Sequence, residues 1–155
     1  MAIRTVRGDL LDQPVQVIVN AWNRNVIPWW LLLPQGVSGA IKKRGGYQPF
    51  RELSRIGSIP AGGARLTSAG QLPFNAIIHV AAINLLWRSS PDIVKSCVVN
   101  ALTLAAEHRF ASIAIPLIGS GTGGLDPEKS KSCIIDSAET ASFDGDIIVV
   151  EFSRR

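Results

Sequence analysis

Histidine, cysteine and long apolar runs are scarce in this chain of 155 residues, and each scarcity excludes a class of protein. The two cysteines and two histidines lack the spacing of a metal cluster, and they form no recognisable Cys–His or Ser–His–Asp set. No apolar run approaches the roughly 20 residues that a membrane helix needs. The N-terminus, Met-Ala-Ile-Arg-Thr-Val-Arg, has no apolar signal core. We therefore expect a cytoplasmic protein without a metal or other cofactor and without membrane contact.

What is present indicates a compact globule, with 46% hydrophobic and 18% charged residues. The length suits one domain over residues 1–155, and we expect a monomer. The net charge is +4, and the basic runs Lys42–Arg44 and Arg154–Arg155 favour solvated surface charge over a site for a polyanion. Cys97 and Cys133 are expected to be reduced, buried thiols.

Strand-like and helical segments alternate along the chain. The strand-like runs are Ile3–Arg7, Gln16–Ala21, Ala64–Ser68, Ala76–Ala81, Ser112–Leu117 and Asp146–Phe152. Most of them are rich in Ile and Val and apolar throughout, as expected for strands buried on both faces. Helical patterns cover Val37–Arg44, Pro49–Ile56, Pro91–His108 and Pro127–Ala141. This alternation predicts an α/β fold with a mixed or largely parallel sheet and helices on both faces.

A glycine-rich stretch, Gly119–Gly124, is the most informative local feature, with four glycines in six residues. It follows an apolar run and leads into Asp126-Pro127-Glu128, which has the residue types of a helix start. Such a turn can direct backbone N–H groups at a phosphate. It is neither a Walker loop nor a dinucleotide fingerprint, and alone it is equally typical of a tight strand–helix connection. Ligands of such sheets bind outside the carboxyl ends of the strands, which selects the loops at residues 20–36 and 119–125.

Several motifs, colinear over nearly the whole chain, resemble those of the macrodomain family. They are Gly8-Asp9-Leu10, Val17-Ile18-Val19-Asn20-Ala21-Trp22-Asn23, Gly36-Val37-Ser38-Gly39-Ala40-Ile41, Pro60-Ala61-Gly62-Gly63-Ala64, Leu72-Pro73 with Ile77-Ile78-His79-Val80, and the loop at Gly119–Leu125. The resemblance implies a three-layer α/β/α fold in a bacterial protein that binds ADP-ribose. It further implies hydrolysis of ADP-ribosyl links on modified protein carboxylates or DNA bases. The alternatives are a non-catalytic ADP-ribose reader and a related nucleotide or sugar-phosphate enzyme.

The resemblance also assigns roles to residues. Asp9 would accept a hydrogen bond from the adenine amino group, assisted by the backbone N–H of Leu10, although an Asp that caps the turn is the simpler interpretation. Phe152 would lie against the adenine or pack in the core. Asn20 and Asn23 would flank the distal ribose and form the catalytic pair, with Asn23 at the position that is often catalytic. The diphosphate and ribose would contact Gln35, Gly36, Val37, Ser38, Ser120, Gly121, Thr122, Gly123, Gly124 and Leu125.

Three departures from the family pattern bear on mechanism. Ile27–Gly36 replaces most of a glycine run and includes Trp29 and Trp30, which would either cover the ligand, contact a base or fill the core. Ser38 stands where one hydrolytic branch has an aspartate. Leu66–Ser68 and Gly123 stand where another branch has a lysine and an aspartate. His79 is expected in the core and His108 at the end of a helix, and the sequence shows neither a catalytic Cys–His or Ser–His–Asp set nor a metal cluster. The chemistry would therefore come from amides, backbone donors and the substrate.

Overall fold

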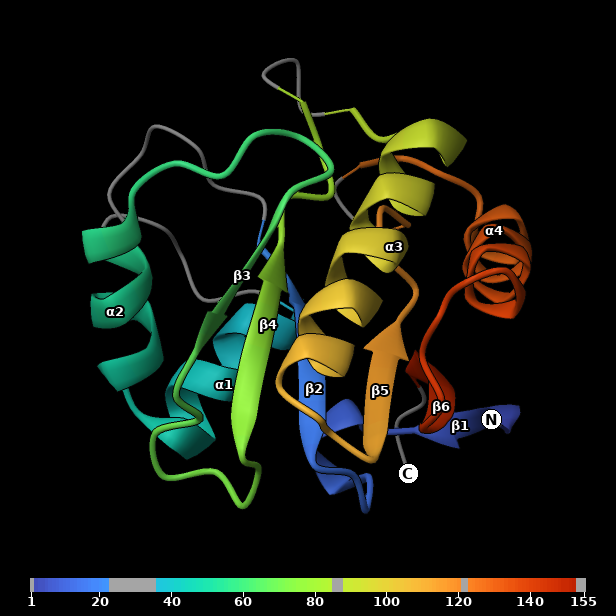
Figure 1. Cartoon of the computed structure of the whole chain (residues 1–155). Helices are drawn as coiled ribbons and strands as arrows, with labels where there is room; N and C mark the ends of the chain where they lie inside the picture. The colour runs from blue at the N-terminus through green and yellow to red at the C-terminus, as the bar shows by residue number, and fades with distance from the viewer. Residues whose placement is uncertain (1, 23–35, 85–87, 121–122, 153–155) are drawn as a thin grey trace.

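The computed structural model describes residues 2–22, 36–84, 88–120 and 123–152. Within them, six strands form one sheet in the order β1-β6-β5-β2-β4-β3 (Figure 1). The strands are β1 (Ile3–Gly8), β2 (Val17–Ala21), β3 (Ala64–Thr67), β4 (Ala76–Val80), β5 (Ser112–Pro116) and β6 (Asp146–Phe152). Neighbouring strands run parallel except β3, which is antiparallel to β4. The carboxyl ends of the parallel strands therefore meet at one edge of the sheet, here called the carboxyl edge.

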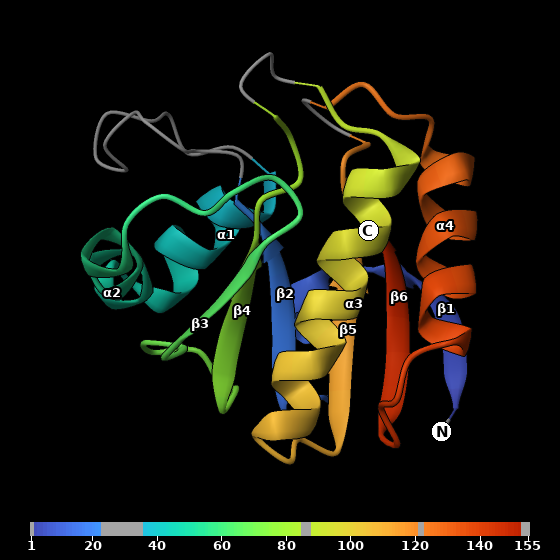
Figure 2. The same cartoon turned by 45° about the horizontal axis from the view of Figure 1, so that its top comes forward.

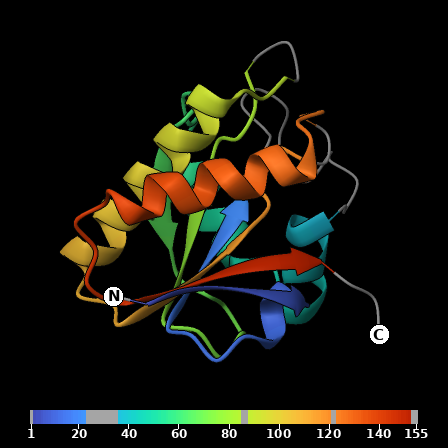
Figure 3. The same cartoon turned by 90° about the vertical axis from the view of Figure 1, so that its right-hand side faces the viewer.

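Helices cover both faces of the sheet. The helices are α1 (Gly36–Gly45), α2 (Gln48–Ile56), α3 (Pro91–Glu107) and α4 (Pro127–Glu139), with a short 3-10 turn, η1 (Leu10–Asp12), in the described part of the chain. The helices α3 and α4 lie on one face, and α1, α2 and η1 lie on the other (Figures 2 and 3). The three-layer α/β/α arrangement and the largely parallel sheet predicted from the sequence are confirmed.

The strands β2, β4, β5 and β6 are largely apolar because they contribute to a core on both sides of the sheet, whereas the edge strands β1 and β3 carry the exposed residues Arg4, Arg7 and Arg65. All five residues of β4 are buried: Ile78 and Val80 pack toward α3, and Ile77 packs toward α1 and α2. The predicted start of α4 is also confirmed, since the Asp126 carboxylate accepts a hydrogen bond from the backbone N–H of Lys129. Among the described residues, no helix is long and apolar enough to span a membrane.

Two predictions about single residues were wrong. Lys42 is buried, with 7% of its surface exposed, because its ammonium lies over the rings of Trp22 and Phe50, 5.5 Å and 4.8 Å from their centres. Cys133 is half-buried rather than buried. The thiol of Cys97 is buried as expected, and this burial raises its pKa to about 12.

Packing of α3 on the sheet gives a direct test of the fold. Leu102 is buried beneath α3, whereas Val99 of the same helix is exposed. We expect Leu102→Ala to lower the free energy of unfolding by about 2–5 kcal/mol, through lost burial and a cavity. Urea denaturation measures the change, and Val99→Ala should stay within about 0.5 kcal/mol of wild type. Equal effects of the two substitutions would contradict this packing.

Candidate functional site

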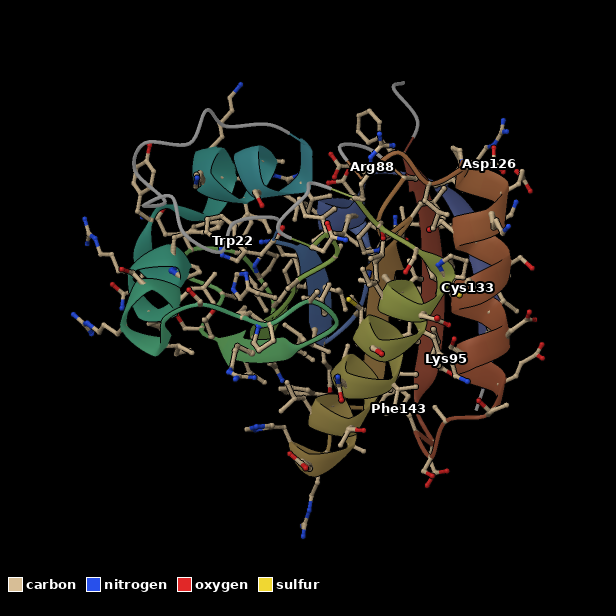
Figure 4. All side chains as sticks on the ribbon, turned by 90° about the horizontal axis from the view of Figure 1, so that it is seen from above. Trp22, Arg88, Lys95, Asp126, Cys133 and Phe143 are labelled. Carbon is tan, nitrogen blue, oxygen red and sulfur yellow. The ribbon has the colours of Figure 1, made fainter. Side chains whose placement is uncertain are left out.

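Among the residues that the structure describes, several of those singled out from the sequence lie along the carboxyl edge, at the ends of four neighbouring strands. Asp9 follows β1, and Phe152 ends β6 directly beside it, since Gly8 is the register partner of Phe152. The glycine-rich loop follows β5, and Asn20 lies near the end of β2. Three strand spacings separate β1 from β2, about 14 Å. Figure 4 looks down on this edge, with Trp22 on the side of α1 and α2.

Asp9 occupies the β1 end of the edge and caps η1. One carboxylate oxygen accepts a hydrogen bond from the backbone N–H of Leu11 at 2.9 Å, and the other lies 3.7 Å from the Arg44 guanidinium. Arg44 also pairs with Asp12 at 3.2 Å, so it connects the end of α1 to η1. The turn-capping role is thus present. The contact with adenine stays a prediction, as does the assisting N–H of Leu10, whose side chain is buried.

Phe152 is the most exposed of the large hydrophobic residues in the described chain, at 73%. The alternative that it packs in the core is therefore wrong. An exposed aromatic ring beside Asp9, at the end of a buried strand, offers a flat apolar surface at the carboxyl edge.

The loop after β5 is held by backbone contacts at its two described ends. The N–H of Leu125 donates to the carbonyl oxygen of Gly119 at 3.0 Å. The N–H of Ser89 donates to the carbonyl oxygen of Gly123 at 3.1 Å. Gly119 has φ +79°, a conformation that favours glycine. At Gly123, a Cβ atom would lie 2.6 Å from the Gly119 oxygen, so a larger residue does not fit. The predicted contact residues Gly121 and Thr122 lie outside the described residues.

A chain of hydrogen bonds, buried at its middle, runs from α1 across β2 and β4 to β3. The Ser38 hydroxyl donates to the Asn20 amide oxygen at 2.9 Å, and the Asn20 amide nitrogen lies 3.0 Å from Nδ1 of His79. Nε2 of His79 lies 2.8 Å from the Thr67 hydroxyl, which donates to the carbonyl oxygen of Ser68 at 2.9 Å. We call these five residues the Ser38–Ser68 chain.

The middle of the Ser38–Ser68 chain is closed to solvent. Asn20 and His79 are 0% exposed, and the edge of the His79 ring packs on Phe50. Burial lowers the pKa of His79 to about 3, so the ring is neutral at physiological pH. Burial also lowers the pKa of the nearby Lys42. His79 lies in the core as predicted, but its contact with Asn20 was missed, because only the strand order makes the two residues cross-strand partners.

The direct ribose contact predicted for Asn20 stays a prediction, as do the contacts of Gly36, Val37, Ser38, Ser120, Gly124 and Leu125. Asn23, Gln35, Trp29 and Trp30 lie outside the described residues. Ser120 is half-buried, and its hydroxyl donates to the carbonyl oxygen of Leu117 at 2.9 Å. Among the residues that the structure describes, no group of His, Cys, Asp and Glu side chains could hold a metal ion.

The buried neutral His79 predicts a pH dependence of stability. An unfolded histidine titrates near pH 6.5, whereas the folded ring takes a proton only near pH 3, so the unfolded state binds more protons between these values. The contribution of neutral His79 to the free energy of unfolding is fully present above pH 6.5 and is lost as the pH falls toward 3. Between pH 7 and pH 5, its loss should lower the free energy of unfolding by about 2 kcal/mol, measured by urea unfolding. His79→Gln should lack this component and His108→Gln should keep it; an equal pH response in all three proteins would contradict the assignment.

Comparisons with known proteins agree with this geometry. The Macro domain family model matches residues 19–134. A macro domain-containing protein of Listeria monocytogenes is 40% identical over 137 residues, covering 83% of this chain and 73% of the relative. The O-acetyl-ADP-ribose deacetylase of Enterobacter cloacae is 32% identical over 143 residues, covering 87% and 76%.

A solved structure extends the agreement to the fold. The Oceanobacillus iheyensis macrodomain, determined with ADP, superposes with a TM-score of 0.79 at 28% identity, covering 97% of this chain and 83% of the other. The family match spans most of the chain, and the sheet order and layers suit it. The chain belongs to the Macro domain family.

Proposed function

We propose that this protein binds ADP-ribose along the carboxyl edge and hydrolyses ADP-ribosyl links on modified protein or DNA. The observation that carries the proposal is the order of groups along the edge. An acceptor carboxylate and an exposed aromatic ring lie at β1 and β6, a glycine-rich turn lies at β5, and amide and hydroxyl groups lie at β2 and α1. This order suits an adenine, then a diphosphate, then a sugar.

The phosphate position is supported by backbone chemistry rather than by cationic side chains. Glycines allow close approach of backbone N–H groups to an anion, and the nearby start of α1 at Gly36 adds the positive end of a helix dipole. Two relatives support the same ligand class: the name of the Enterobacter protein contains ADP-ribose, and the Oceanobacillus structure holds ADP. Adenosine diphosphate is the part shared by both ligands.

The proposed catalysis is positional. Ser38 and Gly123 stand where hydrolytic branches have acidic residues, so we assign no general base to the protein. Asn23, assisted by Asn20, would hold a water near the anomeric carbon or ester together with a phosphate oxygen of the substrate. The loop at Gly119–Leu125 would fix the diphosphate. Orientation of bound reactants can supply several kcal/mol of barrier reduction, about 7–11 kcal/mol at best.

Asp9 tests the adenine end of the site. Asp9→Asn keeps an oxygen for the N–H of Leu11 but removes the charged acceptor, so calorimetry should record a loss of ADP-ribose affinity of about 10-fold or more. Asp12→Asn is the matched control, since Asp12 lies in the same turn and pairs with the same Arg44. Unchanged affinity in folded Asp9→Asn protein would remove the adenine assignment.

Asn23 separates an enzyme from a reader. Asn23→Ala should keep most of the ADP-ribose affinity yet lose on the order of 100-fold in turnover, because water positioning counts mainly in the transition state. The assay follows free ADP-ribose released from carboxylate-modified protein and from modified DNA. Parallel losses in affinity and rate would make Asn23 an ordinary ligand contact. A wild-type protein that binds ADP-ribose but releases none would be a reader.

A further inference from the structure

In the Ser38–Ser68 chain, the donor and the acceptor of each hydrogen bond can be assigned, because each bond contains one hydrogen. The Thr67 hydroxyl lies 2.9 Å from the Ser68 carbonyl oxygen, which can only accept. We place the single hydroxyl hydrogen between these two oxygens, since otherwise two lone pairs would face each other in a partly buried contact. The Thr67 oxygen is then left as an acceptor for Nε2 of His79, at 2.8 Å. The ring therefore carries its hydrogen on Nε2.

The protonated nitrogen of the His79 ring in turn fixes the orientation of the Asn20 amide. A neutral histidine holds one hydrogen, and burial lowers the pKa of His79 to about 3, which keeps the ring neutral. With Nε2 protonated, Nδ1 is a bare acceptor and faces the amide nitrogen of Asn20 at 3.0 Å. The amide is thereby fixed with its oxygen toward α1. That oxygen accepts the hydroxyl hydrogen of Ser38 at 2.9 Å.

The half-buried Ser38 is the end of the Ser38–Ser68 chain nearest the carboxyl edge. It lies in the first turn of α1, while Asn20, His79 and Thr67 lie buried on β2, β4 and β3, and the exposed Ser68 follows β3 at the other end. Its one hydrogen is committed inward to Asn20, so its oxygen has only lone pairs left for a partner. A serine hydroxyl normally rotates to donate or accept as needed; this one is held in a single role.

We propose that Ser38 meets the ligand only as a hydrogen-bond acceptor and receives a hydrogen bond from a hydroxyl of the distal sugar, with Asn20, His79 and Thr67 as positioning residues that hold it in that role. This rests on the proposed ADP-ribose function. Sugar hydroxyls can donate to such an oxygen, whereas a phosphate or carboxylate presents lone pairs to lone pairs. The subsite would therefore select a sugar over a terminal anion, while the glycine-rich loop takes the diphosphate.

The tautomer of His79 is the first test, and it needs no ligand. Two-bond proton–nitrogen correlation spectra of labelled wild-type protein distinguish a protonated ring nitrogen from a bare one. We expect the hydrogen on Nε2. A hydrogen on Nδ1 would reverse the links of His79 to Thr67 and to Asn20 and the link of Asn20 to Ser38, so that the Ser38 hydroxyl would be free to donate to the ligand. This result would overturn the proposal.

The second test compares two ligands that differ in the distal sugar. Ser38→Ala should weaken ADP-ribose by about 5- to 10-fold and leave ADP, which lacks that sugar, within about 2-fold. Thr67→Val, remote from the ligand, should act in the same direction, because Nε2 of His79 loses its acceptor and the direction of the chain is released. Thr103→Val, on the exposed face of α3, is the matched control and should change neither affinity.

These outcomes distinguish a failure of the proposed ADP-ribose function from a failure of the acceptor role of Ser38. If wild-type protein fails to bind ADP-ribose, the proposed function itself fails. If wild type binds but Ser38→Ala loses ADP-ribose and ADP equally, or loses neither, the acceptor role fails and the proposed function stands. Should Thr67→Val not fold, the Ser38→Ala comparison and the tautomer of His79 in the wild type still decide the proposal.

Discussion

Parallel strand direction is the constraint on which the site depends. In the described sheet, five strands share one direction, so the segments after β1, β6, β5, β2 and β4 all leave at the same edge. The inner strands β6, β5, β2 and β4 are buried on both faces of the sheet, which makes them largely apolar. Polar groups for a ligand are then supplied by strand ends and loops. The chain has few charged residues, and backbone N–H groups, amides and hydroxyls fill that role.

Secondary structure and layers were predictable from the sequence because they follow from periodicity and helix-start residues. Asp126 and Pro127 start α4 with a cap hydrogen bond, as expected, and Ser90 caps α3 in the same way, with Pro91 in its first turn. The turn η1 was not predicted, although the Asp9 cap was one of the interpretations considered. A three-residue turn carries no periodic signal, and its cap residue alone is common in loops.

Interior contacts were less predictable, because they depend on strand order and helix orientation. Lys42 looked like surface charge within a basic run, but the turn of α1 directs it onto Trp22 and Phe50. His79 was expected to be in the core, but the sequence around it did not predict its contact with Asn20. Asn20 and His79 are 59 positions apart and meet only because β2 pairs with β4. Local sequence patterns do not predict such long-range partners, because the contact depends on which strands pair.

The central claim is that ADP-ribose lies along the carboxyl edge between β1 and β2. Titrating nitrogen-15-labelled protein with ADP-ribose and mapping the shifted backbone amides tests it most directly. The account predicts that the largest changes fall at residues 9–11, 36–38 and 119–125, with α4 beyond its first turn unaffected. Changes centred on the outer faces of α3 and α4, or no changes at saturating ligand, would contradict it.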